Sequence, residues 1–253
     1  MKAWLLALAL LAACPAHAVS VRVEGRVAHP GAQTLPDDAR LAQALLAAQV
    51  QPDAYVLGAA WLRPSLRPAQ QQLKAGVLYD LAVLAGQARL DGDADVQALG
   101  ERLAQAVRAM PVTGRATAAL LDPRPLEVST QNHLLGDGDR VLFPARPSTV
   151  RVTGAVRQDC ALPHQPLRDA ADYLADCALD AAADRDWLYV IEPDGVVSRL
   201  GVALWNRADA QPLAPGALLY VPVRGKAASA VDPHLNDDLA AWLATQLLPG
   251  MQP

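Results

Sequence analysis

One short stretch occurs twice in the chain, first as Val21-Arg22-Val23-Glu24-Gly25-Arg26-Val27 and again as Val150-Arg151-Val152-Thr153-Gly154-Ala155-Val156. In both copies valines alternate with other residues, which predicts a strand with one buried face. The shared glycine permits a bulge or the close approach of another backbone. Because these positions match at one constant spacing, we predict two related domains in tandem.

Each copy also has a similar closing segment. The two segments are Leu135-Gly136-Asp137-Gly138-Asp139-Arg140-Val141-Leu142-Phe143-Pro144 and Leu213-Ala214-Pro215-Gly216-Ala217-Leu218-Leu219-Tyr220-Val221-Pro222. In this alignment Gly138 matches Gly216, and Pro144 matches Pro222. The opening and closing segments lie farther apart in the first copy, which predicts an insertion of about 50 residues there.

The elements between these segments indicate the fold class. Each copy runs in the order strand, strand, helix and further strands, which is the β-grasp order, a mixed sheet covered by one helix. We therefore predict an α+β protein with two tandem β-grasp domains, at residues 19–147 and 148–225.

The inserted segment carries two helical patterns. Apolar residues recur at helical spacing through residues 73–84 and again through residues 96–110, and residues 86–92 supply the connection. The pattern predicts an αα-hairpin at about residues 65–110, inside the first domain. We expect its apolar stripes to pack on each other or on that parent domain.

Residues 1–18 have the pattern of a bacterial secretory signal. Lys2 precedes an apolar run, and Ala16-His17-Ala18 offers the small residues of a cleavage site. The alternative is a lipoprotein signal, because Leu11-Ala12-Ala13-Cys14 has the form of a lipoprotein box in which Cys14 is lipidated. With either signal, we expect the mature protein in the periplasm.

Composition and cysteine count limit the possible classes of protein. The chain has 253 residues and a net charge of −4, which argues against a nucleic-acid binder. After the signal, no apolar run is long enough to span a membrane. Apart from Cys14, the cysteines are Cys160 and Cys177. In an oxidising compartment they form a disulfide or remain two buried thiols, and their spacing fits no zinc motif.

Enzymatic signatures are missing from the sequence. It has no nucleophile elbow, no phosphate-binding loop, no dinucleotide fingerprint and no zinc-protease motif. We therefore predict no catalytic residue and no cofactor. The acidic run at residues 91–95 resembles half of a calcium loop but lacks the glycine and the bidentate glutamate, so we predict a solvated turn and no metal site.

Arg115 is the charged residue that stands out, beside Thr113 and Gly114. Gly114 permits a tight turn, and the planar fork of an arginine suits the carboxylates or phosphates of acidic polysaccharides and lipid-linked sugars. The alternative is structural, with Arg115 paired to an acidic residue and bracing the hairpin against the first domain. Three tryptophans pose a similar choice between stacking on sugars and packing in the core: Trp61, Trp187 and Trp205.

The tail at residues 226–253 predicts one more helix. Asp232 is a suitable cap and Pro233 suits the first helical position, so we expect a helix over residues 233–248. Its apolar face comprises Leu235, Leu239, Trp242, Leu243 and Leu247. This face docks on a domain or inserts into a membrane or partner, and the neighbouring acids Asp237 and Asp238 favour docking.

Taken together, these segments resemble the GfcC family of periplasmic capsule and exopolysaccharide biosynthesis proteins. The resemblance is carried by the repeated V-x-V-x-G strands, by Pro111-Val112-Thr113-Gly114-Arg115, by L-x-D-G-D-R-V from Leu135 and by the tail from Asp232. It implies two β-grasp domains of the soluble-ligand-binding (SLBB) type, similar to the periplasmic domains of Wza-type outer-membrane exporters, with a helical hairpin inserted in the first.

The resemblance also implies a function without established chemistry. We expect an accessory protein for capsule or exopolysaccharide assembly or export, with a polysaccharide or an outer-membrane export complex as partner. We expect membrane contact only through the tail helix or a lipidated Cys14. The alternative is an enzyme that modifies polysaccharide around Arg115, although the sequence offers no pair of carboxylates for glycoside chemistry there.

Overall fold

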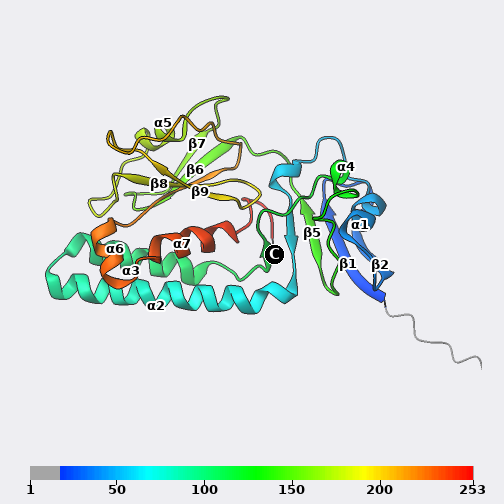
Figure 1. Ribbon diagram of the computed structural model, residues 1–253, viewed down its shortest axis with the longest axis horizontal. Coiled ribbons are helices and arrows are strands. Elements are labelled where there is room, and N and C mark those ends of the chain that lie inside the picture. The colour runs from blue at the N-terminus through cyan, green and yellow to red at the C-terminus, as the bar shows by residue number, and fades with distance from the viewer. Residues whose placement is uncertain (1–17, 253) are drawn as a thin grey trace, which may run out of the picture.

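The structure, a computed structural model, describes residues 18–252 (Figure 1). Cys14 and all of the expected signal except Ala18 lie outside this range. The described chain is α+β and contains two five-stranded sheets and several helices.

The first sheet has the strand order β2-β1-β5-β3-β4. Its strands are β1 (Ala18–Gly25), β2 (Gly31–Pro36), β3 (Ala60–Leu62), β4 (Arg115–Ala116) and β5 (Arg140–Phe143). Strand β1 is antiparallel to β2 and parallel to β5, and β3 is antiparallel to both β5 and β4. The other elements of this half are α1 (Leu41–Ala48), α4 (Pro123–Leu126) and the 3-10 turns η1 (Val56–Gly58) and η2 (Pro64–Leu66). Leu41 and Leu45 of α1 share a core with Val21 and Val23, so α1 covers one face of the sheet.

The second sheet has the strand order β7-β6-β10-β8-β9. Its strands are β6 (Thr149–Gly154), β7 (Cys160–Pro163), β8 (Trp187–Ile191), β9 (Val197–Gly201) and β10 (Leu218–Val221). Strand β6 is antiparallel to β7 and parallel to β10, and β8 is antiparallel to both β10 and β9. Helix α5 (Ala170–Ala175) contributes Ala170 and Tyr173 to the core of this half.

The two sheets correspond strand for strand, as the sequence repeat predicts. Strands β1 and β6, which contain the repeated valines, take the same place in their sheets. Gly25 and Gly154 both have positive φ, and a Cβ on either would overlap the carbonyl oxygen of Phe143 or Val221. The repeated glycine therefore serves a close approach to the parallel closing strand, because no larger residue fits there.

The inserted hairpin consists of α2 (Arg67–Asp91) and α3 (Ala94–Ala109). Only Gly92 and Asp93 connect them, so the connection is shorter than expected and Gly86 lies inside α2. Gly92 is left-handed with φ 73°, and the Asp93 carboxylate accepts from the backbone N–H of Val96. These are a C-terminal and an N-terminal helix cap, which explains the tight turn.

The apolar stripes of the hairpin pack on each other, as expected, but the alternative that they pack on the parent domain is wrong. They share one core with the second sheet and with α6 (Gly225–Val231) and α7 (Leu235–Ala244). Figure 1 shows α7 between the second sheet and the two long helices. The first sheet already has α1 on one face, whereas the second sheet depends on α7 and the hairpin to cover the face that carries Tyr189.

Helix α7 is shorter than the expected helix over residues 233–248, and most of its apolar face is buried. Leu235, Leu239, Trp242 and Leu243 all have exposed fractions of 8% or less. Leu247 lies beyond the helix and packs on the small cluster of Ala60, Leu62 and Leu142 at the first sheet. The tail thus contacts both sheets. Within residues 18–252, no helix combines the length and the apolar character that crossing a membrane requires.

Candidate functional site

The segment Thr113-Gly114-Arg115 lies where the hairpin returns to the first sheet, between α3 and β4. Gly114 has φ 78°, and its N–H donates to the side chain of Gln70 in α2 at 2.7 Å. The Gln70 amide in turn donates to the Arg115 carbonyl at 2.9 Å. Because a Cβ on Gly114 would lie 2.5 Å from the carbonyl oxygen of Arg63, the turn requires glycine. Helix α2 therefore fixes the backbone beside Arg115.

The Arg115 side chain points into the protein and is only 4% exposed. One terminal nitrogen donates to the carbonyls of Gln246 at 2.7 Å and Ala244 at 3.3 Å, and the other donates to the carbonyl of Pro193. Thr113 donates its hydroxyl to the carbonyl of Thr245 at 2.7 Å. These carbonyls belong to the C-terminal end of α7 and to the turn between β8 and β9. A cation at this end of a helix satisfies its last carbonyls and its dipole.

Main-chain carbonyls, and not a paired acidic side chain as the structural alternative expected, accept the hydrogen bonds of the Arg115 guanidinium. Among residues 18–252 it forms no salt bridge, and its Nε has no hydrogen-bond partner. Burial lowers the pKa of Arg115 to about 10, while the charge of Asp194 opposes the shift. The guanidinium is therefore still a cation at neutral pH, stabilised by three carbonyl dipoles.

A cavity of about 480 Å³ opens beside Arg115. Its lining comes from α2, β4, the turn between β8 and β9, and α7, and includes Gln70, Thr117, Gly195 and Ala241. None of the lining residues is an Asp, Glu, His or Cys, the side chains that most often transfer protons near neutral pH. Elsewhere in the described chain, no three His, Cys, Asp or Glu side chains gather as they would around a metal ion.

Cys160 and Cys177 form a disulfide in the structure, with their Cα atoms 6.1 Å apart. Cys160 begins β7 and Cys177 follows α5, so the bond joins an edge strand of the second sheet to the segment after its helix. This position fits a structural disulfide in an oxidising compartment.

The three tryptophans have different surroundings. Trp61 is buried, and its Nε1 donates to the Asp139 carboxylate at 3.0 Å. Trp187 is half-buried at the start of β8, whereas Trp205 is 70% exposed. The rings of Trp187 and Trp205 meet edge to face at 6.3 Å. Trp61 is thus a core residue, and the other two form part of a surface.

Sequence reasoning missed two polar residues with defined roles. Gln70 is a buried amide within a helix, and Arg199 places its guanidinium 3.9 Å above the ring of Trp187. The sequence signal for Gln70 is weak, because a single glutamine in a helix does not indicate that its side chain binds the return segment of the hairpin. Arg199 shares a face of β9 with Val197, but no local pattern indicates which aromatic residue lies opposite.

The comparisons with known proteins agree with the two-part organisation. The model described as "Capsule biosynthesis GfcC, N-terminal" matches residues 16–147, and the model described as "Capsule biosynthesis GfcC C-terminal" matches residues 158–248. The chain is also 34% identical over 160 residues to the uncharacterized protein YjbG of Escherichia coli strain K12. That alignment covers 63% of this chain and 64% of the relative, slightly under two thirds of its length. The chain therefore belongs to the GfcC family of capsule biosynthesis proteins.

Proposed function

We propose that this protein is a periplasmic accessory protein for capsule or exopolysaccharide assembly or export, and that it binds the polysaccharide, the export machinery or both. The observation that carries the proposal is the match of both GfcC models, which together span nearly all of the described chain. The shared strand order of the two sheets supports two β-grasp domains of the SLBB type.

A binding role without catalysis agrees best with the surroundings of Arg115. Glycoside hydrolysis usually requires two carboxyl groups on either side of the scissile bond, and the cavity beside Arg115 has none in its lining. The terminal nitrogens of Arg115 already donate to main-chain carbonyls. We therefore propose that Arg115 joins the tail to both sheets, and we keep a polysaccharide-modifying enzyme as the alternative.

A periplasmic location is supported by the disulfide between Cys160 and Cys177, because such bonds persist in oxidising compartments. Residues 1–17, which carry most of the expected signal and Cys14, are not described by the structure. We propose that the tail helix docks on its own chain, since its apolar side chains are buried by α2 and the second sheet.

The proposal is tested with the purified mature protein and the surface polysaccharide of the strain that carries the gene. We expect retention of the protein on immobilised polysaccharide, or its co-purification with export components from detergent extracts, and no new reducing ends in the glycan after incubation. A protein that does neither, or that releases reducing ends or substituents, contradicts the accessory role.

A further inference from the structure

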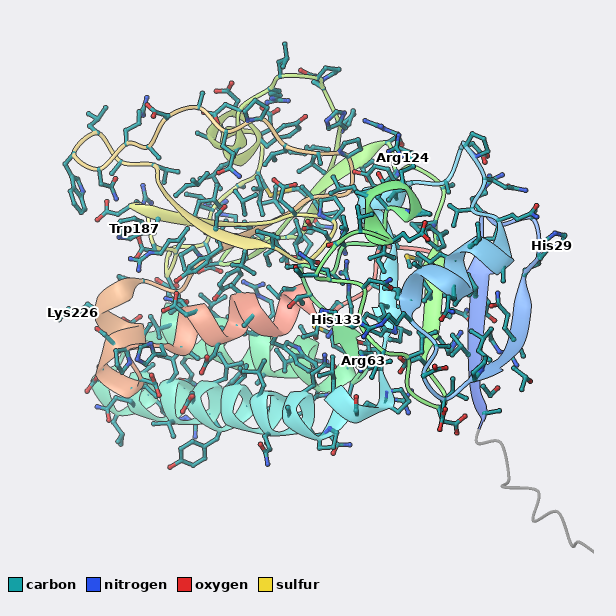
Figure 2. The ribbon with its side chains drawn as sticks, turned by 45° about the vertical axis from the view of Figure 1, so that its right-hand side comes forward. His29, Arg63, Arg124, His133, Trp187 and Lys226 are labelled. Atoms are coloured by element: carbon teal, nitrogen blue, oxygen red, sulfur yellow. A yellow bond between two sulfur atoms is a disulfide. The ribbon has the colours of Figure 1, made fainter. Side chains whose placement is uncertain are left out.

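We propose that a surface on the second sheet binds a sugar residue that carries a carboxylate, such as a uronic acid, through Trp205, Trp187 and Arg199. This inference rests on the proposed function and names the site and the ligand class. The surface lies where β8 and β9 meet the corner between α6 and α7, and its cavity shares no lining residue with the cavity beside Arg115. Figure 2 shows Trp187 and Lys226 of α6 at the same end of the molecule, opposite His29.

Trp205 is held out into solvent by a braced loop. The loop follows β9, and its neighbour Leu204 is 91% exposed. The Asn206 side chain donates to the carbonyl of Asp186 at 2.9 Å and accepts from the N–H of Ala203 at 3.0 Å. Because the backbone is fixed on both sides, Trp205 has little freedom to fold back onto the sheet. The ring of Trp205 adjoins that of Trp187, and contiguous exposed apolar groups, unlike single ones, mark binding surfaces.

Arg199 provides a cation without an acidic partner, next to the ring of Trp187. Its guanidinium lies 3.9 Å from the ring centroid of Trp187, which is the geometry of a cation–π contact. Among residues 18–252 the side chain forms no hydrogen bond or salt bridge. Stacking on Trp187 leaves the N–H edge of the guanidinium available to donate two hydrogen bonds to a carboxylate. Arg199 and Trp205 both contact Trp187, so a short oligosaccharide could reach both.

Two carboxylates also line this surface, but both already have donors. A cavity of about 170 Å³ lies there, and Asp184 and Asp237 are among its lining residues. The Asp184 carboxylate accepts from the N–H groups of Asp186, Trp187 and Gly225, and Asp237 accepts from the hydroxyl of Tyr189. These hydrogen bonds fix both carboxylates in place, and neither forms an ion pair with Arg199. Arg199 is the group that lacks a counter-ion.

The chemistry of these groups favours an anionic sugar over a neutral one. An indole face stacks on the apolar C–H face of a pyranose of either kind, because that contact depends on shape and polarisability. The unpaired guanidinium adds a strong interaction only when the sugar bears a carboxylate. A sugar with its apolar face on Trp205 and its carboxylate on Arg199 satisfies both groups.

The test compares oligogalacturonides, which are acidic, with cellohexaose, which is neutral, by isothermal titration of the purified mature protein. The variants are Trp205→Ala and Arg199→Gln. The control is Arg124→Gln, which removes a cation of the first half whose side chain is 86% exposed. Circular dichroism melts check that each variant remains folded.

We expect wild type and Arg124→Gln to bind the acidic oligomers equally, with Trp205→Ala and Arg199→Gln at least about tenfold weaker. Cellohexaose should bind weakly to wild type and be insensitive to Arg199→Gln. Added salt should weaken binding of the acidic oligomers and leave binding of cellohexaose unchanged, because salt screens an exposed ion pair.

Three results overturn the inference. One is equal binding by wild type and both variants, which leaves the proposed function intact and places glycan binding elsewhere. The second is failure of wild type to bind either oligomer, while Trp205→Ala and Arg199→Gln are retained on the strain's own polysaccharide as well as wild type is. The third is loss of co-purification with export components in Trp205→Ala without loss of glycan binding, which makes this surface a protein interface. Failure of wild type in both the retention and the co-purification experiments contradicts the proposed function itself.

Discussion

The Arg115 guanidinium donates a 2.7 Å hydrogen bond to the main-chain carbonyl of Gln246, which lies 131 residues later in the chain. This bond joins the edge strand β4 of the first sheet to the segment that directly follows the tail helix α7. The same side chain also reaches Pro193 in the second half. One buried cation therefore ties together both halves and the tail, and its loss should be felt by the whole fold.

Replacing Arg115 should destabilise the protein strongly. Arg115→Met leaves two buried carbonyls and one partly buried carbonyl without their donor, and we expect a loss of about 3 kcal/mol in the free energy of unfolding. Urea denaturation measures the loss. Arg124→Met, at a solvated arginine of the first half, should leave the urea midpoint unchanged. Equal midpoints for Arg115→Met and wild type would show that the carbonyl contacts contribute nothing.

Asp139 should give the stability a measurable pH dependence. Burial raises the pKa of its carboxyl above the ordinary value, although the Gly136 N–H, Arg63 and Trp61 oppose the shift. A raised pKa means that the folded state holds more protons, so this residue's contribution falls as pH rises from about 3.9 through the folded pKa.

The matched variant for this prediction is Asp139→Asn, which keeps an oxygen to accept from Trp61 or Gly136. The free energy of unfolding of wild type minus that of Asp139→Asn should decrease between pH 4 and pH 7, as measured by urea titrations. An increase over that range would mean that Arg63 and the N–H donors outweigh burial. Asp139→Ala also removes the acceptor and should be about 2 kcal/mol less stable than Asp139→Asn at any pH in this range.

The disulfide should stabilise the protein by lowering the conformational entropy of the unfolded chain. Cys160 and Cys177 are 17 residues apart, and closing a loop of that size contributes about 3 kcal/mol in the chain-entropy model. We expect a reducing agent to lower the melting temperature of wild type. The double variant Cys160→Ala/Cys177→Ala should melt at that lower temperature with or without reductant. A wild-type melting temperature that is the same with and without reductant contradicts the prediction.

The tail helix should behave as part of the core. Trp242 is fully buried between the hairpin and the second sheet, so Trp242→Ala should cost about 3–5 kcal/mol in the free energy of unfolding. Trp242→Phe should cost less, because the indole N–H is buried without a partner and its removal returns some stability. Ala241→Ser, on the exposed side of α7, is the control and should be silent. A free energy of unfolding for Trp242→Ala equal to that of wild type would indicate that the helix is not part of the core.

Much of the fold could be predicted because its signals are local and repeated. The alternating valines and the shared glycine, Gly25 or Gly154, indicate the same strand in both halves. The insertion follows because the opening and closing segments lie farther apart in the first copy. The partner of the hairpin could not be predicted, because an apolar stripe on α2 fits any apolar surface. Its actual partner is α7, far along the chain. Gly86 misled because an isolated glycine is tolerated within a long helix.

The candidate sites show the same division. Thr113 to Arg115 stand out as a motif, yet the groups that receive the Arg115 donors are main-chain carbonyls, which leave no trace in residue identity. Trp61 and Trp205 are the same residue type beside predicted strands, and only tertiary packing buries one and exposes the other. Arg199 lacked any local signal, since its partner Trp187 lies on a neighbouring strand.

The most direct test of the accessory role is the surface polysaccharide of a strain that lacks the gene, quantified and analysed for repeat-unit composition beside the parent and a complemented strain. The account predicts less polysaccharide at the cell surface, with the composition of the repeat unit unchanged, and recovery on complementation. An unchanged amount of surface polysaccharide, or a repeat unit with an altered linkage or substituent, would contradict it.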